Sequence, residues 1–291
     1  MMNLQQLKIS MIGAGNLATR LACALHESGC SVIQVFSRTM RSAELLAKQV
    51  EAQPICNTEE VDDRADVLIF ALADKVLPDI IPLVAARNPK ALMAHTAGSM
   101  PMRVFSPHAK RYGVFYPLQT FSKYREVDFK PIPFFIEASD GEGLSLLKTL
   151  AGLLSEKVYE ADSEQRKRLH LAAVFANNFA NHCYALSQQL LQQYDLPFEV
   201  LLPLIDETAA KVHDMAPLKA QTGPAIRFDE NVIRAQEKLL EGSPISQQVY
   251  RLMSESIHRL AVENTAVQFN PTPGEKPHDN GSTSTSTNSD K

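Results

Sequence analysis

A glycine-rich turn near the amino end is the residue pattern with the clearest chemical meaning. It reads Gly13-Ala14-Gly15-Asn16-Leu17-Ala18, follows a short apolar run and precedes helix-forming residues. The first glycine permits a tight turn, the second lets the backbone approach a pyrophosphate, and the alanine allows close packing. The unpaired N–H groups that begin the helix can bind phosphate oxygens. The pattern predicts a dinucleotide site formed by Gly13, Ala14, Gly15, Asn16 and Leu17. The alternative is a domain of this type that has lost its ligand.

The end of the second expected strand, Ser37-Arg38-Thr39, indicates which dinucleotide is bound. An acidic residue about 20 positions after the glycines would hold the ribose 2′-hydroxyl of NAD, and none occurs at this turn. A guanidinium between two hydroxyls suits a 2′-phosphate, because arginine binds phosphate through paired hydrogen bonds. The sequence therefore predicts NADP(H), held by Ser37, Arg38 and Thr39, with Arg41 as a further candidate. The alternative is that Arg38 simply begins a solvated helix.

Two further strand ends are expected at the same edge of the sheet, where open parallel sheets bind ligands. One reads Ala71-Leu72-Ala73 and the other His95-Thr96-Ala97-Gly98-Ser99. We assign Ala71, Leu72, Ala73 and Thr96 to the cofactor, Ser99 to the substrate and His95 to acid–base catalysis. The alternatives are ordinary turn and capping chemistry for the hydroxyl residues and a backbone hydrogen bond for the histidine.

Polar side chains on a long apolar helix form a second candidate group. Residues advance about 100° each along an α-helix, so His170 and Asn177 lie within about 20° of one another. Asn181 falls on the same stripe. The histidine can exchange protons near neutral pH, and the asparagines can orient a carbonyl or imine. We assign His170 and Asn177 to catalysis and Asn181 to the substrate; the alternative is that all three form hydrogen bonds within the helical part.

Two more polar residues are assigned to the substrate. Arg227 follows the helix-breaking Gly223-Pro224 and can bind a carboxylate through two hydrogen bonds. The alternative is an ion pair with Asp229 that fixes the loop. Gln119 lies with Tyr116 in a loop that is expected to close over a nicotinamide ring, although the tyrosine has an equally simple role as a core aromatic.

The elements that must position these residues alternate along the first half of the chain. Short apolar runs separated by helical patterns are typical of βαβ units. They predict an α/β fold, a Rossmann-type, mostly parallel sheet with helices on both faces. Strands are expected at Leu7–Ile12, Val32–Phe36, Val67–Ala71, Lys90–His95, Val114–Tyr116, Phe134–Ala138 and Val158–Tyr159, and helices at Leu17–His26, Ser42–Val50 and Gly143–Leu154.

The pattern becomes entirely helical after Asp162, which forms a capping box with Gln165. One long helix is predicted to about Tyr194, followed by helices at Glu199–Val212, Asp229–Leu240 and Ser246–Gln268. The predicted domains are 1–162, which binds NADP, and 163–269, a helical domain for substrate binding and dimerisation. Residues 270–291 are rich in Ser, Thr, Pro and Gly and are expected to be a disordered tail.

Composition narrows the class of protein. The chain has 291 residues, 45% of them hydrophobic, a formal net charge of −4 and four cysteines. This charge gives no electrostatic reason to expect nucleic acid or an anionic membrane as partner. The cysteines have no zinc spacing, so no metal is expected. With no signal peptide and no apolar run of about 18 residues, a cytoplasmic protein is expected.

Several segments together resemble a known family. They are the glycine turn with Ser37-Arg38-Thr39, the turn after His95, Gly113–Phe121, His170–Asn178 and Thr222–Asp229. They resemble predicted NADP oxidoreductases that join a Rossmann-like domain to a helical C-terminal domain of unknown function. That group is similar to pyrroline-5-carboxylate reductase and to the 6-phosphogluconate and hydroxyisobutyrate dehydrogenase superfamily. The resemblance covers roughly residues 5–268.

The resemblance implies a two-domain enzyme, often a homodimer joined through its helical domains, with hydride transfer in an interdomain cleft. Hydroxyacid dehydrogenases of the superfamily carry a catalytic lysine shortly before an asparagine pair, and Val174 occupies that place here. We therefore expect an NADP(H)-dependent oxidoreductase of a small carbonyl, imine or hydroxy-acid metabolite. One alternative is a non-catalytic NADP-binding sensor or scaffold, which the missing lysine favours. Another is a reductase of pyrroline-type imines.

Overall fold

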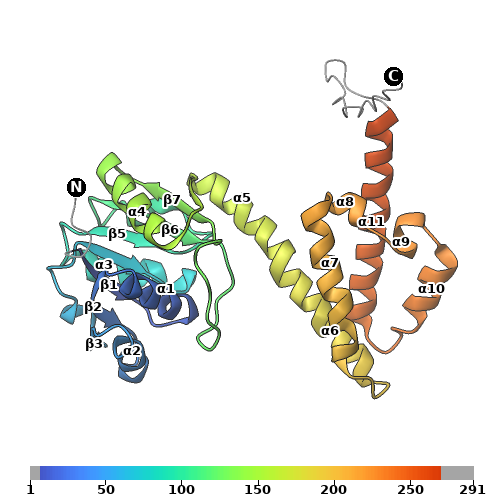
Figure 1. The fold of residues 1–291 in the computed structure, drawn as a ribbon, viewed down its shortest axis with the longest axis horizontal. Helices are drawn as coiled ribbons and strands as arrows, with labels where there is room; N and C mark the ends of the chain where they lie inside the picture. Colours follow the sequence, from blue (N-terminus) through green and yellow to red (C-terminus); the bar gives the residue numbers. More distant parts are fainter. Residues whose placement is uncertain (1–6, 270–291) are drawn as a thin grey trace, which may run out of the picture. The chain divides into compact units, whose positions relative to one another are not determined.

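The computed structural model describes residues 7–269, and the side chains of residues 7–264. The predicted tail at 270–291 lies outside the described residues. Eight strands form one sheet in the order β3-β2-β1-β4-β5-β6-β7-β8 (Figure 1). Neighbouring strands are parallel except β6 and β7. Their bounds are β1 Lys8–Ile12, β2 Ser31–Phe36, β3 Gln53–Ile55, β4 Val67–Phe70, β5 Leu92–His95, β6 Tyr112–Pro117, β7 Phe134–Ala138 and β8 Val158–Glu160.

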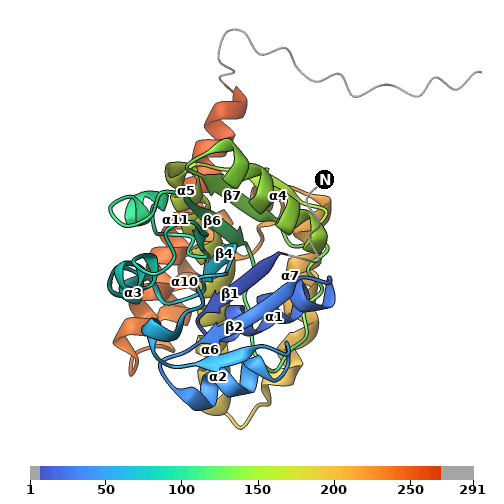
Figure 2. The ribbon, with the colours of Figure 1, turned by 90° about the vertical axis from the view of Figure 1, so that its left-hand side faces the viewer.

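Helices cover both faces of this sheet, because alternate residues of its buried strands point to opposite sides. The helices α1, α2 and α4 pack on one face, and α3 with the short helix η4 packs on the other. Figure 2 shows α3 apart from α1 and α4 across the sheet. The predicted fold class is confirmed. The bounds are α1 Asn16–Glu27, α2 Met40–Ala47, α3 Leu77–Ala85 and α4 Gly141–Leu154, with short helices η2 Thr58–Glu60, η3 Asp74–Val76 and η4 Met102–Phe105.

The order of the strands creates the point at which ligands bind in this class of fold. The chain moves from β1 to β2 and β3 on one side, and then returns to place β4 on the other side of β1. The connections after β1 and β4 therefore leave the sheet on opposite faces, which opens a crevice at their carboxyl ends. Both connections carry predicted site residues.

The remaining elements are helical. The capping box of Asp162 and Gln165 is present at the start of α5, as expected. By compactness, the chain divides into one unit that ends at His182 and another that begins at Cys183. The first unit therefore includes α5, whereas the predicted boundary lies directly before it. The bounds are α5 Ser163–Ala173, η5 Val174–Phe179, α6 Ala180–Gln192, η6 Phe198–Leu201, α7 Leu202–Asp214, α8 Pro217–Ala220, α9 Pro224–Arg227, α10 Glu230–Lys238 and α11 Pro244–Phe269.

The sequence missed several of these elements for identifiable reasons. Helix α3 contains Pro82, which argues against a helix interior, and β3 has only three residues. The predicted continuous helix after Asp162 contains a π-helical turn at Val174–Phe179, and no composition cue marks such turns. Across residues 7–269, no helix combines the length and the apolar character needed to cross a bilayer.

Two glycines allow a matched test of the packing. A Cβ on Gly113 in β6 would lie 2.4 Å from the carbonyl oxygen of Glu137 in β7, whereas Gly152 in α4 has no neighbour within 4 Å. We expect Gly113→Ala to lower the free energy of unfolding by about 1–3 kcal/mol, and Gly152→Ala to raise it by about 0.5–1 kcal/mol. Urea unfolding of both variants measures the difference; equal stabilities would contradict the described β6–β7 pairing.

Candidate active site

The glycine turn joins β1 to α1 in a conformation that needs glycine. Gly13 has φ +128°, and its N–H donates to the carbonyl of Phe36 at 2.9 Å. A Cβ at this position would lie 2.3 Å from the carbonyl oxygen of Ala71, directly after β4. The turn after β1 and the end of β4 are therefore in backbone contact, and Ala71 lies directly beside Gly13.

The turn also fits a bound diphosphate. Gly15 is the N-cap of α1 and nothing lies within 4 Å of a Cβ built on it. No side chain caps this helix and no acidic residue occurs in its first turn. The first N–H groups of α1 thus have no side-chain cap, and they lie at the positive end of the helix. Backbone donors without a competing carboxylate are what the phosphates of a nicotinamide dinucleotide require.

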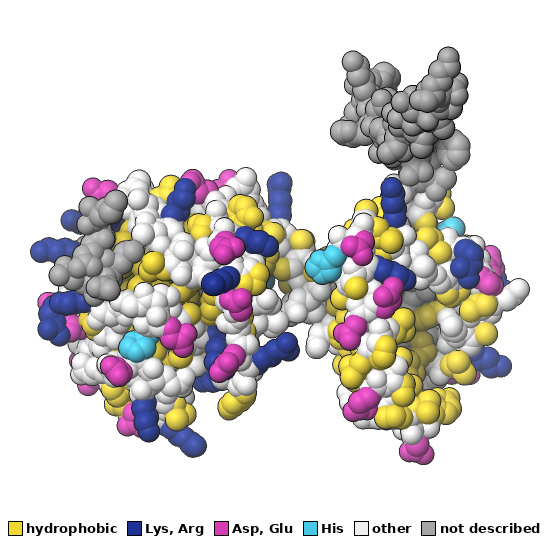
Figure 3. Space-filling model, viewed as in Figure 1, with side chains coloured by type: hydrophobic (Ala, Val, Ile, Leu, Met, Phe, Trp, Pro, Cys, Tyr) yellow, Lys and Arg dark blue, Asp and Glu magenta, His cyan; other side chains and the backbone are white. Residues whose placement is uncertain are grey.

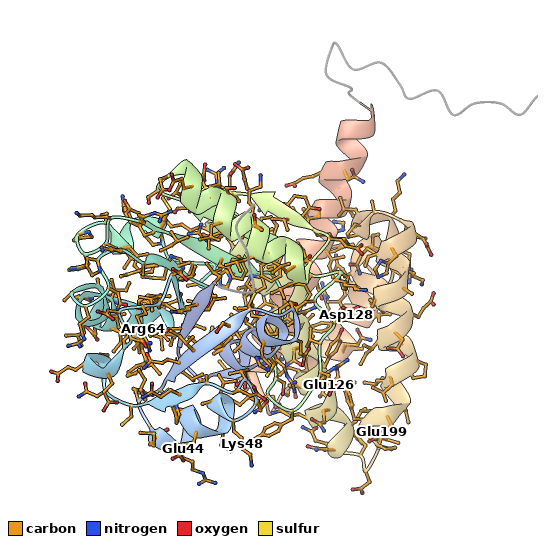
Figure 4. The ribbon with its side chains drawn as sticks, turned by 60° about the vertical axis from the view of Figure 1, so that its left-hand side comes forward. Glu44, Lys48, Arg64, Glu126, Asp128 and Glu199 are labelled. Carbon is orange, nitrogen blue, oxygen red and sulfur yellow. The ribbon has the colours of Figure 1, made fainter. Side chains whose placement is uncertain are left out.

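The end of β2 carries the predicted 2′-phosphate residues in an accessible position. Ser37 is partly buried, and Arg38 and Thr39 are exposed at the start of α2. Thr39 donates from Oγ1 to Oγ of Ser42 at 2.9 Å. In the described part of the chain the guanidinium of Arg38 has no ion pair or hydrogen bond, so it is available to an anion. Lys48 and Glu44 lie further along the same helix (Figure 4).

The ends of β4 and β5 are linked by side chains. Ser99 donates to the carboxylate of Asp74, the first residue of η3. Thr96 is buried, and both its N–H and its hydroxyl donate to the carbonyl of Phe70. The threonine hydroxyl therefore supports the alternative reading, ordinary turn chemistry. Ser99 remains at the edge of the crevice beside an acidic group. Leu72 is partly buried there and Ala73 is exposed.

A tyrosine and a histidine meet at the carboxyl end of β6. The hydroxyl of Tyr116 lies 3.1 Å from Nδ1 of His170 on α5, and the two rings are edge to face with centroids 6.2 Å apart. Tyr116 is 8% exposed, and His170 is partly exposed. Burial raises the pKa of the Tyr116 hydroxyl, nearby Asp74 raises it further and Arg166 opposes the change. The phenol is therefore protonated at neutral pH.

A buried arginine holds α5 against the sheet. Arg166 is 0% exposed; it pairs with Glu137 of β7 and donates to the carbonyl of Met100 at 2.6 Å. Ser163 donates to Glu137 at 2.9 Å and accepts from the N–H of Met102 at 3.0 Å. The loop after β5 and the first turn of α5 are thus tied to the same carboxylate. One helical turn later, this attachment brings His170 to Tyr116.

His95 lies in the core rather than in the crevice. Its side chain is 0% exposed, stacks on Phe105 at 5.7 Å between centroids and accepts at Nδ1 from the N–H of Ala97. Burial, with a smaller effect of Arg166, lowers the pKa of His95 to about 3. The imidazole is therefore neutral at physiological pH. This environment favours the backbone-bonded reading over acid–base catalysis.

The π turn changes the expected stripe of His170, Asn177 and Asn181. Its hydrogen bonds run to the fifth residue along the chain, so it widens the helix and displaces the residues after it around the axis by up to about 100°. The two asparagines are exposed and form no side-chain hydrogen bond within the described part of the chain. Of the three residues, only the histidine forms a hydrogen bond with a residue of the sheet.

The other two predicted substrate residues are Gln119 in the first unit and Arg227 in the second. Gln119 is exposed on the loop at 118–133, where its side chain accepts from the N–H of Thr120; Glu126 and Asp128 lie on this loop as well (Figure 4). Arg227 ends α9 in the second unit and is exposed. It has no ion pair within the described residues, since Asp229 instead caps α10 by accepting from Val232.

Sequence reasoning missed three residues of this region. Gly98, Asp74 and Arg166 received no role, and Tyr116 was placed in a loop rather than beside His170. One signal was available: Arg166 precedes His170 by a single helical turn, so both side chains lie on one face. Contact between α5 and the end of β6 depends on the tertiary fold, and a single sequence carries no such information. In the described part of the chain, no group of three His, Cys, Asp or Glu residues is arranged to hold a metal.

Two known sequence families account for most of the chain. Residues 2–119 match a Rossmann-like domain, and residues 132–257 match a domain of unknown function, DUF2520. A crystal structure from Bacteroides fragilis, named a "putative NADP oxidoreductase", is 54% identical over 88% of this chain and 100% of that one, with a TM-score of 0.85. The chain belongs to this Rossmann-like and DUF2520 family. The suspected resemblance is thus confirmed.

Solved structures of much lower sequence identity share the fold of this chain. An imine reductase from Myxococcus stipitatus in complex with NADP+ is 14% identical over 89% of this chain and 94% of that one, with a TM-score of 0.59. A pyrroline-5-carboxylate reductase from Coxiella burnetii is 15% identical over 88% and 97%, with a TM-score of 0.55. Among proteins of curated function, none matches this chain.

The buried His95 predicts a pH dependence of stability. Its pKa of about 3 in the folded protein lies below the ordinary value of 6.5, so the unfolded chain binds a proton first as the pH falls. His95 should therefore lower the free energy of unfolding by about 1.4 kcal/mol per pH unit between roughly pH 6 and 4. His95→Asn, which keeps an acceptor for Ala97, should lose this part of the slope. Urea unfolding at several pH values tests this; identical slopes would show that the imidazole is not buried as described.

Proposed function

We propose that this protein is an NADP(H)-dependent oxidoreductase of a small carbonyl, imine or hydroxy-acid metabolite. The observation that carries the proposal is the turn between β1 and α1. There, Gly13 touches the backbone after β4, and Gly15 leaves the uncapped end of α1 open. When bound there, a nicotinamide dinucleotide supplies or accepts hydride. The name given to the 54% identical relative supports the same activity.

The residues after β2 support NADP over NAD. The strand ends at Phe36, and the next three residues present hydroxyls and the unpaired guanidinium of Arg38. No carboxylate is present there to receive a ribose 2′-hydroxyl. Arg41 adds a second exposed cation in the first turn of α2. A 2′-phosphate would thus find positive charge, and a free 2′-hydroxyl would lack its usual acceptor.

Removal of Arg38 tests the choice of cofactor. Arg38→Ala should weaken NADPH binding by roughly 10- to 100-fold, the effect of losing a charged hydrogen bond, and should leave NADH binding nearly unchanged. Lys48→Ala is the matched control, because it removes one positive charge at the other end of the same short helix. Calorimetric titration measures both cofactors. Equal losses for NADPH and NADH would refute the assignment, and no affinity of the wild type for either cofactor would refute the proposed function.

We further propose that the protein acts as a homodimer joined through its helical part. From Cys183 to residue 264 only Ala225, Leu240 and Ser254 are buried. Large apolar side chains on α7 and α11 are exposed, and Figure 3 shows many hydrophobic side chains on the surface of this unit. Such surfaces mark interaction sites in stable proteins, and a second copy offers the same apolar face in return.

Substitutions on α11 test the dimer. Met253 and Leu260 are seven residues apart, so they lie on the same face of this helix, and both are 47% exposed. Met253→Glu combined with Leu260→Glu should yield a monomer in sedimentation experiments in which the wild type is a dimer, because paired carboxylates would be buried without partners. Glu255→Gln on the same helix should leave the assembly unchanged. A monomeric wild type at micromolar concentration would contradict this proposal.

Location in the cytoplasm is also part of the proposal. Cys23, Cys30, Cys56 and Cys183 are all free in the structure. Unpaired thiols are typical of proteins kept in a reducing compartment.

A further inference from the structure

The contact between Tyr116 and His170 is built into the fold in an unusual way. Gly98, in the turn after β5, is buried directly beside it. A Cβ there would lie 2.6 Å from Nδ1 of His170 and 2.8 Å from the hydroxyl oxygen of Tyr116. Any other residue would push the two rings apart. The contact between Tyr116 and His170 therefore requires glycine at position 98 as well as the two residues themselves.

The pair lies on the side of the crevice that a nicotinamide would reach. In register, Ile12 of β1 pairs with Phe70, Phe70 with His95, and His95 with Val114 of β6. Tyr116, two residues further along β6, thus lies past the carboxyl ends of β1, β4 and β5, at three strand spacings, about 14 Å, from β1. A dinucleotide with its diphosphate at β1 extends its two halves to either side of that strand. With the 2′-phosphate at β2, the nicotinamide half extends toward β5 and β6.

We infer that Tyr116 donates a proton to the substrate, that His170 positions and reprotonates it, and that the substrate is a carbonyl compound rather than an imine. This inference rests on the proposed function. It deepens that function by assigning Tyr116 as the proton donor. On sequence alone, His95, His170 and Asn177 are assigned to catalysis and Tyr116 has no such role.

The proton transfer balances in both atoms and charge. A reduced nicotinamide cofactor held at the turn between β1 and α1 would supply the hydride to the carbonyl carbon, and the C=O π electrons would move to oxygen. The O–H bond of Tyr116 then breaks and a new O–H bond forms on the product alcohol. With hydrogen on Nδ1, His170 returns that proton to the phenolate while Nε2 of its partly exposed ring takes a proton from the solvent. Proton exchange with the solvent then restores the hydrogen on Nδ1. One hydride and one proton are consumed for each alcohol formed.

A phenol is suited to carbonyl reduction and unsuited to imine reduction. An alkoxide is a far stronger base than a phenolate, so a phenol gives up its proton readily as the alkoxide forms. An imine must instead be protonated before hydride arrives, which requires an acid stronger than a phenol at neutral pH. The raised pKa of Tyr116 makes it a still weaker acid, which further disfavours protonation of an imine before hydride arrives.

The charged groups around the pair are consistent with this role. Asp74 approaches from η3 and disfavours the phenolate, whereas Arg166 approaches from α5 and favours it. His95 from β5 is neutral at physiological pH because of its burial. The two charges act in opposite directions, and burial has the largest effect on the pKa of Tyr116. Tyr116 holds its proton until a strong base forms beside it.

The first test does not depend on turnover. Histidine labelled with ¹⁵N should show a changed Nδ1 resonance for His170 in Tyr116→Phe, because that nitrogen loses its partner. Tyr112→Phe, on the same strand, should leave the resonance unchanged. Gly98→Ala should reproduce the effect of Tyr116→Phe without altering either ring. An unchanged resonance in both Tyr116→Phe and Gly98→Ala would overturn the pair.

The second test uses NADPH oxidation with two sets of probes: glyoxylate, pyruvate and phenylglyoxal as carbonyl compounds, and 1-pyrroline and 1-pyrroline-2-carboxylate as imines. We expect turnover of the carbonyl set. In Tyr116→Phe, kcat should fall about 100-fold or more, as for loss of an acid catalyst, with KM and NADPH affinity nearly unchanged. His170→Gln should reduce kcat less and alter its pH profile, because an amide cannot exchange protons with water as an imidazole does.

Each outcome separates this inference from the proposed function. Turnover of imines alone, or a kcat in Tyr116→Phe equal to that of the wild type, overturns the assignment and leaves an oxidoreductase. Tight NADPH binding without consumption of either set also overturns it and supports a non-catalytic NADP-binding protein. No NADPH binding at all removes the proposed function itself.

Discussion

The buried guanidinium of Arg166 is the constraint on which the candidate site depends. A fully buried cation is stable only when it is paired and hydrogen-bonded, and here Glu137 and the carbonyl of Met100 supply those partners. These partners belong to β7 and to the loop after β5, so a single charge joins three parts of the first unit. The contacts of Ser163 with Glu137 and Met102 attach the first turn of α5 to the same place.

Backbone groups form one half of the crevice, and side chains form the other. On the β1 side, the backbone does the positioning: a glycine with positive φ approaches the chain after β4, and an uncapped helix leaves its N–H groups free. On the β6 side, side chains do it, through Arg166, Ser163 and the Tyr116–His170 contact. The first arrangement suits a phosphate, which is recognised by many backbone donors. The second suits a reaction, which needs a few groups at defined distances.

This difference also explains how far the sequence could predict the site. Turn glycines, strand ends and the capping box are local patterns, and the structure contains the fold and the capping box that they predicted. The acid–base candidates depended on tertiary contacts. His95 ends a strand as expected but points into the core against Phe105, and a strand end alone does not tell which way a side chain points. The asparagine stripe assumed an unbroken α-helix, and the π turn at Val174–Phe179 removed that assumption.

The hydrogen bond between Ser99 and Asp74 has a consequence for how a ligand would lie in the crevice. It fixes a carboxylate at the start of η3, close enough to Tyr116 to affect its ionisation. A ligand that carries its own negative group would be repelled from that corner, since like charges at short range repel one another. Its anionic end would therefore turn away from β4, and its neutral, polarisable end would be the part left facing the phenol. The fixed carboxylate of Asp74 would thus orient a small ligand in the crevice before the reaction begins.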